Sequence, residues 1–156
     1  MNIEVNIRPY LDADWPIVFD AWWRAAWAQH KYEVGGGAPS IPMGSYKLGL
    51  RSRITHLLKA GQTLVATSTT SDEYVLGFVN WQCWAVGGEP LKCVHFIWTR
   101  GGKGGDGGFR RMGVAAQLLE HAGLGTGFRY SQHTGSMGRM RKVWKCEYSP
   151  FLREER

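Results

Sequence analysis

The order of hydrophobic and polar positions predicts alternating strands and helices. Residues 3–9 alternate between apolar and polar side chains, which indicates a strand with one buried face. An acidic, proline-containing stretch at residues 12–16 favours a helix start. Apolar residues spaced four apart then continue that helix to about His30.

A glycine-rich loop divides this helix from the elements that follow. Residues 31–44 hold four Gly and two Pro residues, which predicts a loop. A second apolar stripe predicts a helix that ends at Gly61. In the rest of the chain, runs of β-branched and aromatic residues that are separated by turn residues predict further strands. These elements are strands at 63–69, 74–84, 91–98 and 128–133, and a helix at 109–122 that follows a glycine tract at 101–108.

The start of the helix at 109–122 carries a short motif. Residues 110–115 read Arg-Arg-Met-Gly-Val-Ala, or R-x-x-G-x-A. A helix start presents unpaired backbone N–H groups and the positive end of the helix dipole, and a glycine there lets a phosphate approach the backbone closely. The motif therefore predicts an anion site directly after a strand.

This succession of strand, R-x-x-G-x-A and amphipathic helix resembles the acetyl-CoA-binding core of the GCN5-related N-acetyltransferase (GNAT) superfamily. The predicted element order over residues 3–133 is also similar to that family's order. The resemblance implies an α/β (α+β) fold with a central mixed, mainly antiparallel sheet flanked by helices. Its strands at 91–98 and 128–133 should run parallel and splay at one end. Only 23 residues follow His133, so we expect a shortened C-terminal part.

The resemblance further implies acetyl-CoA, or another acyl-CoA, as co-substrate and a small-molecule or protein amine as acceptor. A backbone N–H near Trp98 and Thr99 would polarise the thioester carbonyl, and the loop at 31–44 would wall the acceptor site. The loop amides of the motif would hold the pyrophosphate. The residues expected to bind acyl-CoA are Trp98, Thr99, Arg110, Arg111, Met112, Gly113, Val114 and Ala115.

Tyr148 and Ser131 are the candidate catalytic residues. A departing thiolate needs a proton, and GNAT enzymes often take it from a late tyrosine. Tyr148 matches that position best and Tyr130 second, although a buried strand residue is an equal interpretation of Tyr148. Ser131 and His133 are polar groups at the end of the last long strand. His95 is more typical of a core histidine, and the family's acidic base has no obvious counterpart.

The first helix carries unusual aromatic bulk. Trp22, Trp23 and Trp27 lie within about one and a half turns of each other. Core packing is the simpler interpretation of this cluster, and a flat wall for a planar substrate is the alternative.

Length and cysteine content limit the classes of protein to which this chain can belong. The 156 residues favour one domain over 1–156. With no apolar run of about 18 residues and no signal-peptide pattern, we expect a cytoplasmic protein without membrane contact. The three cysteines Cys83, Cys93 and Cys146 lack close C-x-x-C spacing, so we expect neither a disulfide framework nor a metal site.

The positive charge gathers in the C-terminal third. Residues 100–156 contain 11 Lys and Arg against 5 Asp and Glu, which accounts for the net charge of +6 and makes nucleic acid a further candidate partner. Phage Mom-type DNA-modification proteins are GNAT-like, and carry a motif arginine, a serine near the fifth strand and a late tyrosine. The residues that resemble this order are Arg110 or Arg111, Ser131 and Tyr148. A GNAT-shaped binding module without catalysis is a third alternative.

Overall fold

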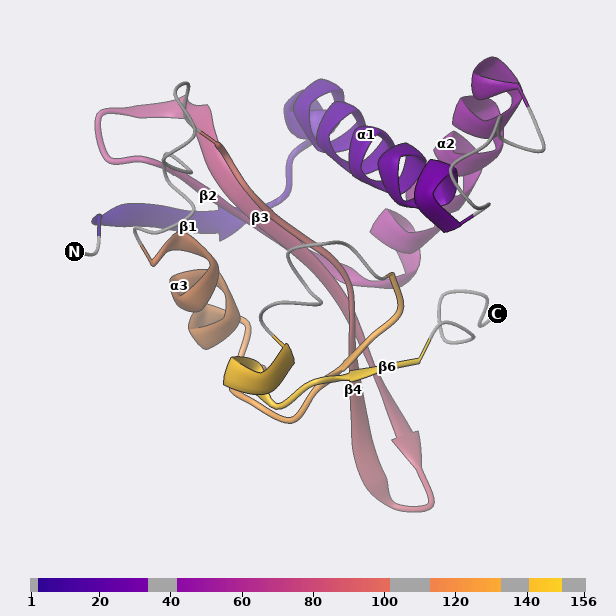
Figure 1. Cartoon of the computed structure of the whole chain (residues 1–156). Helices are drawn as coiled ribbons and strands as arrows, with labels where there is room; N and C mark the ends of the chain where they lie inside the picture. Colours follow the sequence, from indigo (N-terminus) through magenta and orange to yellow (C-terminus); the bar gives the residue numbers. More distant parts are fainter. Residues whose placement is uncertain (1–2, 34–41, 102–112, 133–140, 150–156) are drawn as a thin grey trace.

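The computed structural model describes residues 3–33, 42–101, 113–132 and 141–149. Helices and strands follow one another in the predicted order (Figure 1). The elements are β1 (Val5–Pro9), the 3₁₀ turn η1 (Asp12–Asp14), α1 (Trp15–Glu33), α2 (Met43–Ala60), β2 (Gln62–Ser68), β3 (Ser71–Val86), β4 (Glu89–Thr99), α3 (Val114–His121), β5 (Arg129–Tyr130) and β6 (Glu147–Tyr148). None of the helices in the described ranges is long and apolar enough to cross a membrane.

The strands form one mixed sheet in the order β1-β2-β3-β4-β5-β6. The first four strands pair antiparallel, whereas β5 runs parallel to β4, and β6 runs parallel to β5. Helix α3 connects β4 to β5, as a parallel pair requires. The predicted fold class and the predicted parallel pair are therefore confirmed.

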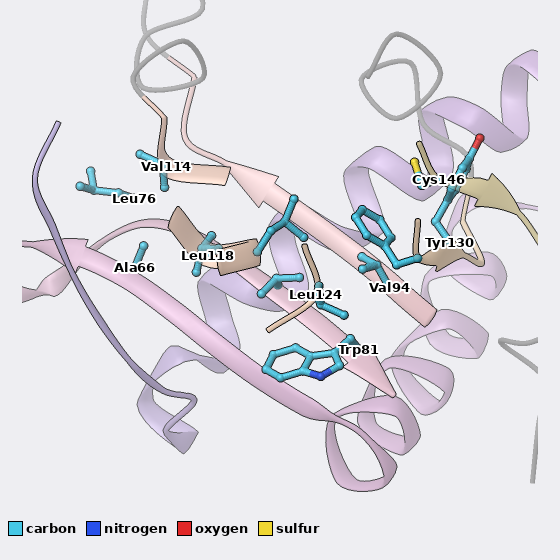
Figure 2. Packing of buried hydrophobic residues seen from close by; sticks show 12 residues of the cluster. Ala66, Leu76, Trp81, Val94, Val114, Leu118, Leu124, Tyr130 and Cys146 are labelled. Carbon is cyan, nitrogen blue, oxygen red and sulfur yellow. The ribbon is translucent and has the colours of Figure 1, made fainter. Parts of the chain in front are cut away.

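Helices cover both faces of the sheet, and each face has its own core. On one face α1 and α2 bury Trp22 and Ile54 against Phe78 and Phe96 of the sheet. On the other face α3 packs through its apolar stripe (Figure 1). Figure 2 shows this second core, which includes Ala66, Leu76, Trp81, Val94, Val114, Leu118, Leu124, Tyr130 and Cys146. The apolar stripe of α3 and the apolar face of the strands thus meet in one hydrophobic core.

A partly buried ion pair fixes the entry into α1. Arg8 of β1 donates to both carboxylate oxygens of Asp14, at 2.7 and 2.9 Å, and the Leu11 N–H donates to the same carboxylate at 2.8 Å. Burial alone would raise the pKa of Asp14, but these hydrogen bonds outweigh it and the net shift is downward. The pair therefore ties the first strand to the helix that forms one wall of the site.

Several boundaries differ from those predicted. Helix α2 begins at Met43, inside the range predicted as loop, because its first turns pack the Tyr46 ring on Trp27 at 5.1 Å; residues 34–41 of that loop lie outside the described residues. The polar residues 71–73, predicted as a turn, belong to β3, where Thr67 and Arg8 contact Asp72. Tertiary contacts outweigh local turn preference at both places.

Candidate active site

The parallel strands β4 and β5 separate after a very short pairing. Cys93 pairs with Arg129 and Val94 with Tyr130, and the Ser131 N–H donates to the Val94 carbonyl at 3.0 Å. Strand β4 continues to Thr99, but within the described ranges its later residues pair only with β3. Among the described residues the pairing of β4 with β5 therefore ends at Ser131, as the predicted splay requires.

A bulge in β4 lies at the same point. Asn80 of β3 pairs with Phe96 and Trp81 pairs with Val94, so His95 has no partner in that register. A bulge leaves one residue out of the ladder and re-aims its side chain. Bulges have no reliable signature in sequence, and the apolar run around His95 predicted a regular strand.

The His95 ring is held by two short hydrogen bonds. Its Nδ1 lies 2.7 Å from the Ser131 hydroxyl oxygen, and its Nε2 lies 2.7 Å from the Gln82 side-chain oxygen. Because an amide oxygen only accepts, Nε2 carries the proton and Nδ1 accepts from Ser131. Burial, with a smaller contribution from His56, lowers the pKa of His95 to about 4. The ring is therefore neutral at pH 7, as expected of a core histidine with both nitrogens paired.

The neighbouring cysteine is a poor nucleophile. Burial raises the pKa of the Cys93 thiol to about 12, although Ser131 and Arg129 oppose the shift. In the part of the chain that the structure describes, no three His, Cys, Asp or Glu side chains gather closely enough to hold a metal ion.

A cavity of about 200 Å³ lies next to the point where the strands separate. Helices α1 and α2 form one side of it, and His95 of β4 forms the other together with the residues at the ends of β5 and β6. Both candidate catalytic residues line it. The lining residues are Trp22, Ala26, Gln29, His30, Tyr46, Leu50, Arg53, Ile54, Leu57, His95, Ser131, Gln132 and Tyr148.

The aromatic cluster of α1 serves both the core and the cavity. Trp22 stacks on Phe96 with ring centroids 5.1 Å apart, and its Nε1 donates to the Gln132 side-chain oxygen at 2.7 Å. Trp27 stacks on His30 at 5.7 Å, whereas Trp23 lies outside the cavity lining, under the Lys47 ammonium. Core packing is therefore confirmed for Trp22, which also lines the cavity, and its role as a wall for a planar substrate stays a prediction.

Tyr148 is the more accessible of the two candidate tyrosines. It lies on β6, is 39% exposed, and stacks on Tyr130 of β5 at 5.3 Å. Tyr130 is 1% exposed and packs in the core with α3. The interpretation of Tyr148 as a buried strand residue is therefore wrong, and that description fits Tyr130.

The expected cofactor-binding residues are only partly described. Gly113 has a left-handed backbone (φ 77°) and caps α3, after which Val114 is buried and Ala115 half-buried. Trp98 and Val114 both approach Gly77, where an added Cβ would lie 2.6 Å from the Trp98 carbonyl oxygen and 3.1 Å from a Val114 methyl group. The start of α3 thus lies beside the end of β4, where Thr99 is also located. Arg110, Arg111 and Met112, like His133, lie outside the described residues.

Several polar residues of the site were not predicted as site residues from the sequence. Gln82 holds His95, and His30, Tyr46 and Arg53 line the cavity. A signal for two of them existed: Tyr46 and Arg53 share a helix face with the apolar residues Leu50, Ile54 and Leu57. Arg53 was interpreted instead, together with Lys47 and Arg51, as part of the outer face of this helix.

Comparisons with known proteins bear on the fold. No protein-family model and no curated protein matches the sequence. Among solved structures, a histone acetyltransferase HPA2 and related acetyltransferase from Corynebacterium glutamicum has a TM-score of 0.54 at 18% identity, over 77% of this chain and 70% of that one. A "possible acetyltransferase" from Clostridium difficile has a TM-score of 0.54 at 12% identity, over 89% and 86%.

A third similar structure names the family. A fungal multi-domain β-N-acetylglucosaminidase contains a GCN5-related glucosamine N-acetyltransferase region and matches with a TM-score of 0.50 at 15% identity, over 78% of this chain and 12% of that one. These likenesses agree with the mixed sheet, the separating parallel pair and the helix between its strands. The chain therefore has the fold of the GCN5-related N-acetyltransferases.

Proposed function

We propose that the protein is an acyl-CoA-dependent N-acyltransferase, which moves an acetyl or other acyl group from coenzyme A to an amine. The observation that carries this proposal is the separation of β4 from β5 at Ser131, beside the bulge at His95. It opens against a cavity that Tyr148 lines. The fold of the similar acetyltransferases supports the same conclusion.

The residues around the separation fit an acyl-CoA. Backbone groups on the β5 side of β4, from Phe96 to Thr99, have no strand partner among the described residues, and peptide groups of this kind bind amide-containing chains well. Gly113 caps the start of α3 without a side chain, which would allow a phosphate to approach the helix N–H groups. A backbone N–H near Trp98 and Thr99 would polarise the thioester carbonyl.

The proposed reaction needs one proton removed and one supplied. The amine nitrogen attacks the thioester carbonyl carbon, a C–N bond forms and the C–S bond breaks. Tyr148 donates its hydroxyl proton to the departing thiolate, and the proton lost by the amine passes to a base. The position of Tyr148 on the cavity, with 39% of its surface exposed, supports this role.

A valine at Gly113 should weaken acetyl-CoA binding. We expect the dissociation constant of Gly113→Val, measured by titration calorimetry, to rise about tenfold or more, because the side chain would occupy the space left for a phosphate. Gly123→Val is the matched control, since Gly123 also has a left-handed backbone (φ 69°) but lies at the other end of α3. Both variants bear similar backbone strain. Equal affinities in the two variants would remove Gly113 from the proposed site.

DNA modification is the second candidate function. Arg141 and Lys142 are exposed and lie a few residues before the strand that carries Tyr148, which favours an anionic partner near the cavity. Replacing both by Gln should weaken duplex DNA binding and flatten its salt dependence by up to about one unit of slope per lost phosphate contact. Titrations at two salt concentrations test this.

Two outcomes would argue against this candidate. Wild-type protein that binds DNA no better at low salt would exclude it. A chain that binds neither DNA nor acetyl-CoA would be a binding module of another kind.

A further inference from the structure

The charged side chains that the structure describes around the cavity are positive. Among the described lining residues, Arg53 carries a positive charge and none carries a carboxylate. Helix α2, which supplies Arg53, also has three other Lys or Arg residues and no Asp or Glu over Met43–Ala60. An alkylammonium ion would meet repulsion here without a carboxylate to offset it, whereas an anionic group would be attracted.

One residue that lines the cavity has a polar atom without a partner among the described residues. Nε2 of His30 is buried and makes no hydrogen bond within the described residues. Its ring is fixed between Trp27, at 5.7 Å, and Tyr46, at 4.7 Å. Buried polar atoms of proteins are nearly always satisfied, so a bound ligand is a natural partner for this nitrogen.

The second imidazole of the cavity is not available for this role. Both ring nitrogens of His95 are occupied by Ser131 and Gln82, and the ring lies 1% exposed within the β4 bulge. The other titratable groups that line the cavity in the described structure are Tyr46, Arg53 and Tyr148. His30 is therefore the group best placed to contact an acceptor N–H.

We infer that the acceptor is a weakly basic aryl amine that carries an anionic group. Its N–H hydrogen-bonds to Nε2 of His30, its anionic group pairs with Arg53, and its ring lies against the aromatic lining. Such an amine is already neutral at pH 7, so it needs no carboxylate partner. As the C–N bond forms, its proton passes to Nε2 of His30. This inference rests on the proposed N-acyltransferase function.

Three probe amines of graded charge test the inference. With acetyl-CoA at pH 7, we expect kcat/KM to be about tenfold higher for 4-aminobenzoate than for the neutral, similarly shaped 4-aminobenzamide. Both should exceed benzylamine, which is protonated at that pH. Release of coenzyme A and the acetylated product would both be measured.

Two residue replacements assign this preference to the cavity. Arg53→Gln should reduce the ratio between 4-aminobenzoate and 4-aminobenzamide to about one, whereas Arg53→Lys should retain most of it. Lys59→Gln is the matched control, because Lys59 is an exposed cation of the same helix outside the lining. His30→Gln should lower kcat for both aryl amines by about 10²-fold, and His121→Gln, on α3 beyond the sheet, should leave it unchanged. Thermal unfolding would verify that each variant is folded.

The results separate this inference from the proposed function. A preference for benzylamine, or an unchanged ratio in folded Arg53→Gln, would overturn the inference while leaving acyl transfer intact. Wild-type protein that binds acetyl-CoA in the calorimeter but acetylates none of the three amines would also overturn it. Protein that does not bind acetyl-CoA at all would refute the proposed function itself.

Discussion

The Tyr148→Phe variant is expected to turn over roughly 10² to 10⁴ times more slowly than the wild type. Phe keeps the ring that stacks on Tyr130 at 5.3 Å, so the edge of the cavity should remain in place. It lacks the hydroxyl group that would protonate the departing thiolate. The loss should fall on kcat, measured as coenzyme A release, while the acetyl-CoA dissociation constant stays near its wild-type value.

Two further tyrosines test whether this loss is specific. Tyr74 is 45% exposed and lies beside Arg100, away from the cavity lining, so Tyr74→Phe should retain full turnover. Tyr130, the second candidate, is buried, and Tyr130→Phe should affect stability more than turnover. Wild-type kcat in Tyr148→Phe would exclude this tyrosine as the proton donor.

The free energy of unfolding should fall by about 3 kcal/mol between pH 6.5 and pH 4 through His95 alone. Burial lowers its pKa from 6.5 to about 4 in the folded protein. The unfolded chain therefore binds a proton in this window that the folded chain does not. The contribution of His95 is complete above pH 6.5, and it is lost as the pH falls towards 4.

A glutamine at this position isolates the contribution of His95. His95→Gln offers a donor and an acceptor to Ser131 and Gln82 but does not titrate. We would measure its free energy of unfolding by urea titration at pH 7 and at pH 4. The decrease from pH 7 to pH 4 should be about 3 kcal/mol smaller in this variant than in the wild type. The exposed residue His121 provides the control, and His121→Gln should follow the wild type. Parallel pH dependence of His95→Gln and the wild type would contradict the neutral, buried ring.

Local patterns were sufficient to predict most of the fold. The alternation in residues 3–9, the apolar stripe of α3 and the strand before the glycine tract each reflect which side chains must be buried. The parallel pair of β4 and β5 followed from the helix between them. Helix α2 was predicted too short, because Gly44 and Gly49 weaken the local signal and packing against α1 compensates.

The site was only partly predictable, because its parts meet from distant segments. Tyr148 was identified through the resemblance to GNAT enzymes and Ser131 by its place at the end of a predicted strand, and the structure brings both to one cavity. His30 and Arg53 become site residues only when α1 and α2 pack over the end of β4. The bulge at His95 depends on the register between β3 and β4, which no short window of sequence encodes.

Because β5 and β6 are short, the proposed activity should be less stable to heat than the fold as a whole. Each contributes only two residues to the sheet, and β6 is held by the register pairs Arg129 with Glu147 and Tyr130 with Tyr148. Elements with so few contacts detach locally at a lower free-energy cost than the central hairpin of β3 and β4. The proposed proton donor therefore lies on the part of the sheet that should open first. On warming, turnover should be lost at a lower temperature than that at which the whole protein unfolds.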